Sequence, residues 1–149
     1  MGQRLGCHHT AMYVSFLQVT LGSCQRSKGY LVTSALLRKE TLKTFIIQQL
    51  DAIEPGLHLV KRQLSTPAGR LDLLCKDVNG NFVVVELKRM QGSDQVVGQI
   101  LRYMGWLKET HRTEKVRGII IVGRKDQALL YAVMGASNVQ VKEFQILIK

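Results

Sequence analysis

The apolar residues of this chain recur at two spacings, which predict an alternation of helices and strands from residue 34 onward. Apolar positions three or four residues apart predict three helices, over residues 34–50, 94–108 and 127–134. Ser34 is a suitable N-cap for the first helix, and Gly135 is a suitable C-cap for the last.

Alternating or continuous apolar runs predict five strands, over residues 57–64, 70–75, 82–87, 118–122 and 139–148. The fourth run is apolar throughout and bounded by glycine, a pattern typical of a strand buried on both faces. The order α-β-β-β-α-β-α-β combines a hairpin sheet with crossovers that favour parallel pairing. The predicted fold class is therefore α/β, with a mixed central sheet flanked by helices.

The first 33 residues differ from the rest because they contain no Asp or Glu. We interpret residues 1–33 as a basic N-terminal extension and residues 34–149 as the domain proper. One form that the extension could take is a β-hairpin of residues 13–21 with residues 30–33.

The loop between the second and third predicted strands fixes which side chains share a face. Asp77 opens the loop and Gly80 closes its four-residue turn, a pattern typical of a type I turn followed by a left-handed glycine. Such a three-residue loop makes Asp77 face Asn81. Counting back along both strands gives the opposing pairs Leu74 with Val84, Asp72 with Glu86, and Arg70 with Lys88.

A two-residue Asn79-Gly80 loop would shift the register by one position and place Asp72 opposite Leu87. We favour the three-residue loop because it alone separates apolar from polar residues. In that register the predicted core face consists of Leu71, Leu73, Cys75, Val83, Val85 and Leu87.

Two facing carboxylates, Asp72 and Glu86, need compensation. At roughly 5 Å and an effective dielectric of about 20, their repulsion is on the order of 3 kcal/mol. A divalent ion bound by carboxylate oxygens would offset this repulsion and leave room for phosphate and water. Lys88 projects from the same face and could activate a water or stabilise charge developing on a phosphate. The alternative is a solvated face on which Glu86 and Lys88 are ordinary surface residues.

The helix over residues 94–108 carries two stripes. The predicted packing stripe is Val97, Ile100, Leu101, Met104 and Lys108, and the second stripe is Gln99, Arg102, Tyr103 and Trp106. Arginine and aromatic side chains at this spacing can accept a nucleic-acid backbone. The alternative is that Tyr103 and Trp106 are half-buried packing residues, which is the better interpretation of Trp106.

The charge adds a preference for the partner. Twenty-one Lys and Arg against eleven Asp and Glu give a net charge of +10, which favours nucleic acid or an anionic membrane surface over a neutral partner. Solubility alone is an alternative explanation. No apolar run reaches about 18 residues, which argues against a transmembrane helix. Three cysteines without metal-ligand spacing favour a reducing cytoplasm.

From about Arg38 onward the sequence contains, in this order, Glu40, Ile53-Glu54-Pro55-Gly56-Leu57, Thr66 to Leu74, Val83 to Arg89 and Gln99 to Tyr103. Together these blocks resemble the nuclease domain of the NucS/EndoMS endonucleases, members of the PD-(D/E)XK superfamily. The resemblance implies a restriction-endonuclease-like core. It also implies cleavage of mismatched, branched or single-stranded DNA.

By that resemblance Asp72 and Glu86 are ligands of Mg²⁺ or Mn²⁺ and Lys88 is the catalytic lysine. Gln99 and Glu40 are further members of the catalytic site.

Four residues are expected to contact DNA: Arg70, Arg89, Arg102 and Tyr103. Gln63 departs from the family, which usually has Glu after Arg62. The family's N-terminal DNA-binding and dimerisation domain has no counterpart in residues 1–33, so mismatch specificity is not expected to carry over. A homodimer is one assembly that the resemblance allows.

The sequence thus favours a metal-dependent DNA endonuclease. A catalytically idle nucleic-acid-binding module of the same fold is the alternative. An interaction protein unrelated to nucleic acid explains the segregated hairpin poorly.

Overall fold

The computed structural model describes residues 10–14, 17–21, 30–32 and 38–148, and it describes side chains from residue 38 to residue 144. In chain order the elements are β1 (Thr10–Val14), β2 (Leu17–Leu21), β3 (Tyr30–Val32), α1 (Lys39–Gln48), α2 (Leu50–Ile53), β4 (His58–Thr66), β5 (Gly69–Lys76), β6 (Phe82–Gln91), α3 (Gln95–His111), β7 (Val116–Arg124), α4 (Gln127–Met134) and β8 (Val139–Ile148).

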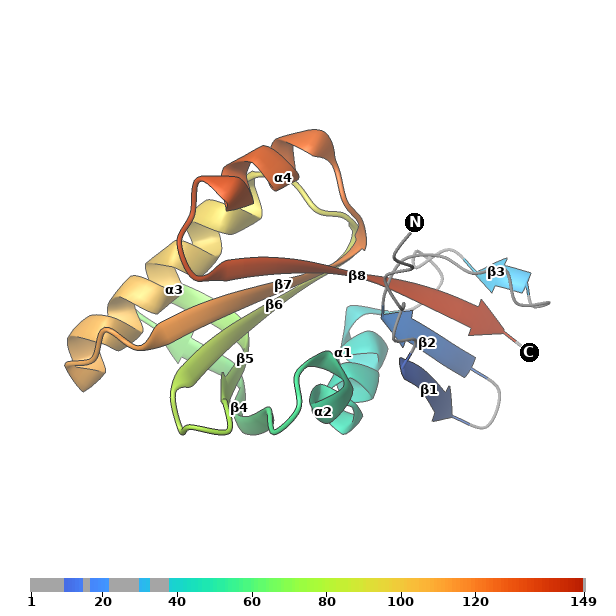
Figure 1. Ribbon diagram of the computed structural model, residues 1–149, viewed down its shortest axis with the longest axis horizontal. Helices are drawn as coiled ribbons and strands as arrows, with labels where there is room; N and C mark the ends of the chain where they lie inside the picture. The colour runs from blue at the N-terminus through green and yellow to red at the C-terminus, as the bar shows by residue number, and fades with distance from the viewer. Residues whose placement is uncertain (1–9, 15–16, 22–29, 33–37, 149) are drawn as a thin grey trace, which may run out of the picture.

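The described strands form one mixed sheet in the order β1-β2-β8-β7-β6-β5-β4, with β3 also paired to β8 (Figure 1). β4, β5 and β6 pair antiparallel, whereas β6, β7 and β8 pair parallel because α3 and α4 cross between them. This arrangement confirms the predicted α/β fold and its order of elements, to which the structure adds the short helix α2.

The sheet continues from the core into the extension. The structure differs here from the expected hairpin, because β1 and β2 pair antiparallel with each other. β2 and β3 both pair with β8 instead of with each other. β8 pairs with β7 only as far as Glu143, so its last residues offer open backbone edges to both strands. The predicted cap Ser34 lies outside the described residues, and the boundary at residue 34 stays a prediction.

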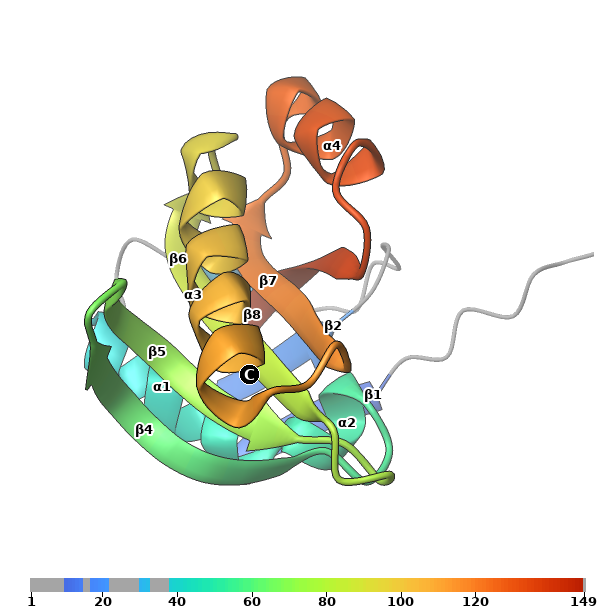
Figure 2. The same cartoon turned by 90° about the vertical axis from the view of Figure 1, so that its left-hand side faces the viewer.

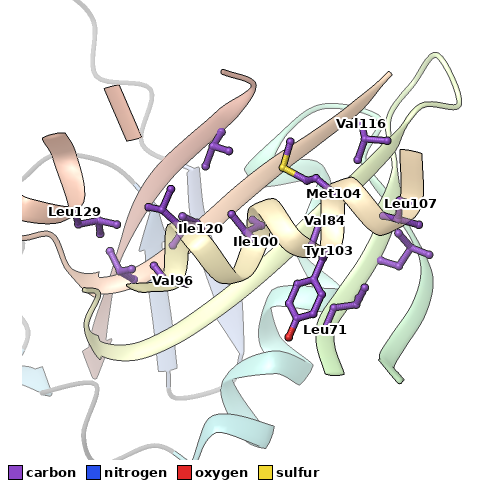
Figure 3. Close-up of a cluster of buried hydrophobic side chains, with 14 residues drawn as sticks. Leu71, Val84, Val96, Ile100, Tyr103, Met104, Leu107, Val116, Ile120 and Leu129 are labelled. Atoms are coloured by element: carbon purple, nitrogen blue, oxygen red, sulfur yellow. The ribbon is translucent and has the colours of Figure 1, made fainter. Parts of the chain in front are cut away.

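Helices cover both faces of the central strands, with α1 and α2 on one face and α3 and α4 on the other (Figure 2). Ile119 and Ile121 pack towards α1, whereas Ile120 and Val122 pack towards α3. β7 is therefore buried on both faces, as its continuous apolar run predicts. Figure 3 shows the cluster under α3, with Tyr103 beside Leu71.

Two of the predicted packing positions are wrong. Leu71 was expected to share a face with Leu73, but it packs under α3 while Leu73 packs under α1. The regular alternation of β5 is broken between them, at Asp72. Leu101 was expected in the core and is 41% exposed, because the face of α3 that meets the sheet is centred on Ile100 and Tyr103.

Candidate active site

The turn between β5 and β6 sets the register of the site. The Asp77 N–H donates to the Asn81 carbonyl at 2.9 Å, and the Gly80 N–H donates to the Asp77 carbonyl at 2.9 Å. Gly80 has a φ of +79°, a conformation that glycine adopts without steric cost. Leu74 pairs with Val84. The three-residue loop and its register are therefore confirmed, and the two-residue alternative is wrong.

Regular pairing of β5 with β6 ends at Leu73 and Val85, one residue before Asp72 and Glu86. Beyond that pair, hydrogen bonds to the two carboxylates replace the regular main-chain pairing of the strands. The Asp72 N–H donates to Glu86 Oε1 at 2.9 Å, and the Leu87 N–H donates to Asp72 Oδ2 at 2.9 Å. Each carboxylate thus accepts a main-chain hydrogen bond from the opposite strand, which fixes both groups between the strands.

Both carboxylates are buried, with Asp72 6% and Glu86 1% exposed. The solvated face that the sequence left open as an alternative is therefore wrong for Glu86. The expected facing of Arg70 and Lys88 lies beyond the last regular pair of these two strands.

A second irregularity lies on β4, opposite Asp72. The pairs Arg62 with Leu73 and Leu64 with Leu71 are regular, but Gln63 between them has a φ of +52°. A residue other than glycine costs roughly 1–2 kcal/mol in this left-handed region. β4 and β5 therefore both depart from regular strand geometry at the level of Asp72, where its side chain turns towards α1.

α1 brings two lysines to Asp72. Lys39 Nζ lies 3.0 Å from Asp72 Oδ2, and Lys43 Nζ lies 3.3 Å from Asp72 Oδ1. The Lys43 side chain is only 4% exposed, against 38% for Lys39. Neither lysine is predicted as a site residue from the sequence. One signal was present: Lys43 stands three residues before Ile46, on the helix stripe that faces the core.

Glu40 was predicted as a further acidic member of the site, and in the structure it is connected to Asp72 through Lys43. Its Oε1 atom accepts from Lys43 Nζ at 3.0 Å. Its Oε2 atom accepts from Arg62 at 3.0 Å and from the Gln63 amide at 2.8 Å. Lys43 therefore joins Glu40 to Asp72.

The two buried carboxyl groups have opposite pKa shifts. Burial raises the pKa of Glu86 to about 7, and the negative charge of Asp72 adds to this effect. Burial would also raise the pKa of Asp72, but the Leu87 N–H and the two lysines outweigh it, so the pKa of Asp72 is lowered. Asp72 is thus the ionised member of the pair near neutral pH.

A chain of hydrogen bonds positions Lys88 from the α3 side. Lys88 Nζ donates to Gln99 Oε1 at 3.3 Å, and the Gln99 amide donates to the Tyr103 hydroxyl at 3.0 Å. The Tyr103 hydroxyl donates in turn to the Arg70 carbonyl at 2.9 Å. These bonds bring Lys88 and Gln99 together.

Tyr103 is only 2% exposed, which corrects its expected place on a surface stripe. Its ring packs against the sheet because it faces the same side of α3 as Ile100 and Leu107. Tyr103 is therefore a positioning residue, and its ring is not available to stack on DNA. Trp106 is half-buried against the same cluster, in agreement with its interpretation as a packing residue.

The three predicted DNA-contacting arginines lie at different depths. Arg70 and Arg102 are exposed, and Arg89 is half-buried near the end of β6. Arg70 also donates to Gln63 Oε1 at 2.6 Å, so its guanidinium is connected to the Glu40 network.

A sequence model described as the Endonuclease NucS C-terminal domain matches residues 38–144. The chain belongs to this family. The match begins where the sequence resemblance was expected to begin, which confirms the family inferred from the motifs.

Two curated relatives illustrate the similarity. Endonuclease NucS of Sulfolobus acidocaldarius is 37% identical over 123 residues, which cover 82% of this chain and 45% of that protein. Endonuclease NucS 1 of Halobacterium salinarum is 30% identical over 116 residues, which cover 76% of this chain and 48% of that protein. The chain thus spans about half the length of these relatives.

Two solved structures share the fold. A repair endonuclease from Pyrococcus abyssi has a TM-score of 0.66 and 20% identity, covering 95% of this chain and 66% of that chain. A complex of EndoMS with double-stranded DNA has a TM-score of 0.65 and 20% identity, with the same shares covered.

The residues of this NucS-type domain fit a hard divalent ion. Within the described residues, no group of three or more His, Cys, Asp or Glu side chains forms a cluster arranged for a metal. Mg²⁺ commonly binds through one or two carboxylates and completes its shell with water and phosphate oxygens. The Asp72 and Glu86 pair matches that requirement, and burial of Glu86 leaves its charge in need of a cation.

Proposed function

We propose that this chain is a DNA endonuclease of the PD-(D/E)XK type that requires Mg²⁺ or Mn²⁺. The observation that carries the proposal is the pair of buried carboxylates, Asp72 and Glu86, each held by the main chain of the opposite strand. Membership of the NucS C-terminal family supports it.

Each residue has a part that follows from its position. Asp72 and Glu86 would hold the ion, which when bound supplies positive charge for a phosphate oxygen and lowers the pKa of a bound water. Lys88 follows Glu86 by two residues on β6 and donates to Gln99, and we propose that its ammonium orients the attacking water or stabilises charge developing on the phosphate. Tyr103 fixes Gln99, and Glu40 fixes Lys43.

DNA is the proposed substrate. The net charge of +10 favours a polyanion, and the exposed side chains of Arg70 and Arg102 can reach a phosphate backbone. A structure of the same fold is that of an EndoMS complex with double-stranded DNA. The helices of the described segments are too short or too polar to cross a membrane. Assembly as a homodimer and a cytoplasmic location stay predictions.

The test is cleavage by the purified chain of single-stranded, branched, mismatched and matched duplex DNA. We expect cleavage of at least one substrate with Mg²⁺ or Mn²⁺, none with EDTA, and none by Asp72→Ala with either ion. No cleavage of any substrate with either ion would contradict the proposal.

One observation favours the second candidate, a catalytically idle DNA-binding module. In the structure both carboxylate oxygens of Asp72 already have a lysine partner, so its charge is compensated without a metal ion. The same assay separates the candidates, because an idle module would bind DNA and leave it intact with either ion.

A further inference from the structure

We infer that the carboxylate site accepts one divalent ion and not two, because the buried ammonium group of Lys43 occupies the position of a second. This inference rests on the proposed function, since it concerns how many ions the same site holds. Lys43 is a positioning residue in this scheme: it holds Asp72 and Glu40 in place and contacts no substrate.

Asp72 is connected to Glu86 by a main-chain hydrogen bond and to Glu40 through Lys43, and each connection is a position at which a cation could lie. One position lies between Asp72 and Glu86, and the other lies between Asp72 and Glu40. Lys43 Nζ fills the second position, 3.3 Å from Asp72 Oδ1 and 3.0 Å from Glu40 Oε1. An ion bridging Asp72 and Glu40 would need the place where this ammonium group lies.

The first position is compensated differently. Within residues 38–144, Asp72 and Glu40 form ion pairs with lysine or arginine side chains, whereas Glu86 forms none. Glu86 is 1% exposed and accepts a main-chain hydrogen bond from Asp72. A divalent ion would therefore add charge where the site lacks it.

The two lysines differ in how readily they can leave. The Lys39 side chain is 38% exposed, so its ammonium can move into water when an ion takes its place on Asp72 Oδ2. The Lys43 side chain is 4% exposed and is enclosed by the residues under α1. A buried ammonium that loses its carboxylate partners is strongly destabilised, so Lys43 stays in place.

Glu40 is also fixed in its present position by other donors. Its second oxygen accepts from Arg62 and from Gln63, whose left-handed backbone orients the amide. These bonds hold the carboxylate, whose side chain is 58% exposed, towards Arg62 and Gln63. One divalent ion, bound by Asp72 and Glu86, is the stoichiometry that these contacts allow.

The experiment is a Mn²⁺ titration of the full chain, by calorimetry and by electron paramagnetic resonance of the bound ion. Wild-type protein should bind one Mn²⁺. Lys43→Gln keeps a donor for Glu40 but removes the charge, and it should bind a second Mn²⁺ with the dipolar broadening of two neighbouring ions. Lys43→Arg should restore a stoichiometry of one.

Lys39→Gln is the matched control, because it removes the other lysine on the same carboxylate. It should still bind one ion, on the order of tenfold more tightly, since a competing charge has gone. Circular dichroism and urea unfolding of each variant report whether it folds. If Lys43→Gln does not fold, the number of Mn²⁺ ions bound by the wild-type protein decides between one ion and two.

Two ions on the wild-type protein would overturn the inference and leave the metal-dependent function standing. A folded Lys43→Gln variant that binds only one ion would also overturn it. Failure of the wild-type chain to bind any Mn²⁺ would instead contradict both the inference and the proposed function.

Discussion

Asp72 and Glu86 have the same chemistry but different surroundings. Glu86 is buried next to a negative charge and has one main-chain donor, so its pKa rises to about 7. Asp72 is buried too, but Leu87 and the lysines of α1 supply enough donors and charge to lower its pKa. A pair with separated titrations can hold one proton between two acids near neutral pH.

The first prediction concerns the pH dependence of stability in the metal-free protein. Between pH 4.5 and about 7 the folded state binds the Glu86 proton more tightly than the unfolded state does, so the free energy of unfolding should fall as pH rises. A shift of this size corresponds to about 3 kcal/mol. Urea unfolding with EDTA at several pH values measures it.

Glu86→Gln should abolish this dependence, because an amide does not titrate. Exposed Glu109→Gln is the control and should behave as the wild type. Asp72, with its lowered pKa, affects stability only at lower pH. An unfolding free energy that changes equally with pH in wild type and Glu86→Gln would refute the assigned titration.

At the scale of the elements, the parts predicted correctly are those fixed by local sequence. The β5–β6 register depends on five consecutive residues, from Asp77 to Asn81, whose side chains and backbone specify the turn. The predicted bounds of α4 and β8, residues 127–134 and 139–148, match the structure because Gly135 and the apolar run mark them directly.

The parts that sequence did not predict depend on contacts between distant segments. Lys43 is buried because α1 packs on the sheet and brings it to Asp72, 29 positions later in the chain. Lysine is seldom buried, so pattern alone assigns it to the surface. The left-handed backbone at Gln63 is likewise a consequence of how β4 meets Asp72. Glutamine is not a typical turn residue, so the sequence does not predict this conformation.

α3 acts on the site through its hydrogen-bond chain from Tyr103 to Lys88. The second prediction is that Tyr103→Phe lowers the free energy of unfolding by about 1 kcal/mol, because the Arg70 carbonyl loses its donor and Gln99 loses a partner. Its cleavage rate should also fall, since Lys88 is less well oriented. Tyr131→Phe, on the exposed face of α4, is the control and should change neither quantity.

Urea unfolding and single-turnover cleavage are the measurements for both variants. If Tyr103→Phe and Tyr131→Phe were equally stable and equally active, the chain of hydrogen bonds would have no role in positioning Lys88.

At the scale of the whole molecule, the site draws on both helical layers. α1 reaches Asp72 from one face of the sheet, and α3 reaches Lys88 through Gln99 from the other (Figure 2). The whole chain has a net charge of +10, which suits an electrostatic attraction to phosphates.

The third prediction is that DNA binding depends steeply on salt. Neutralising about four phosphates gives a slope of log affinity against log salt of roughly −3 to −4. Arg102→Ala should weaken binding and reduce the slope by about 1, because Arg102 is exposed on α3. Lys115→Ala, in the loop after α3, is the control, and fluorescence anisotropy is the measurement. An affinity that does not change with salt would remove DNA as the partner.

The central claim is that Asp72 and Glu86 hold the ion used for cleavage and that Lys88 acts beside it. The most direct test measures Mn²⁺ binding and DNA cleavage on the same preparations of wild type, Glu86→Ala and Lys88→Ala. Glu86→Ala should lose both, because a ligand is gone. Lys88→Ala should bind the ion at least as tightly and cleave roughly 10²–10³ times more slowly, because one donor to the reacting phosphate is gone. Cleavage by Glu86→Ala at the wild-type rate, or loss of Mn²⁺ binding in Lys88→Ala, would contradict this assignment.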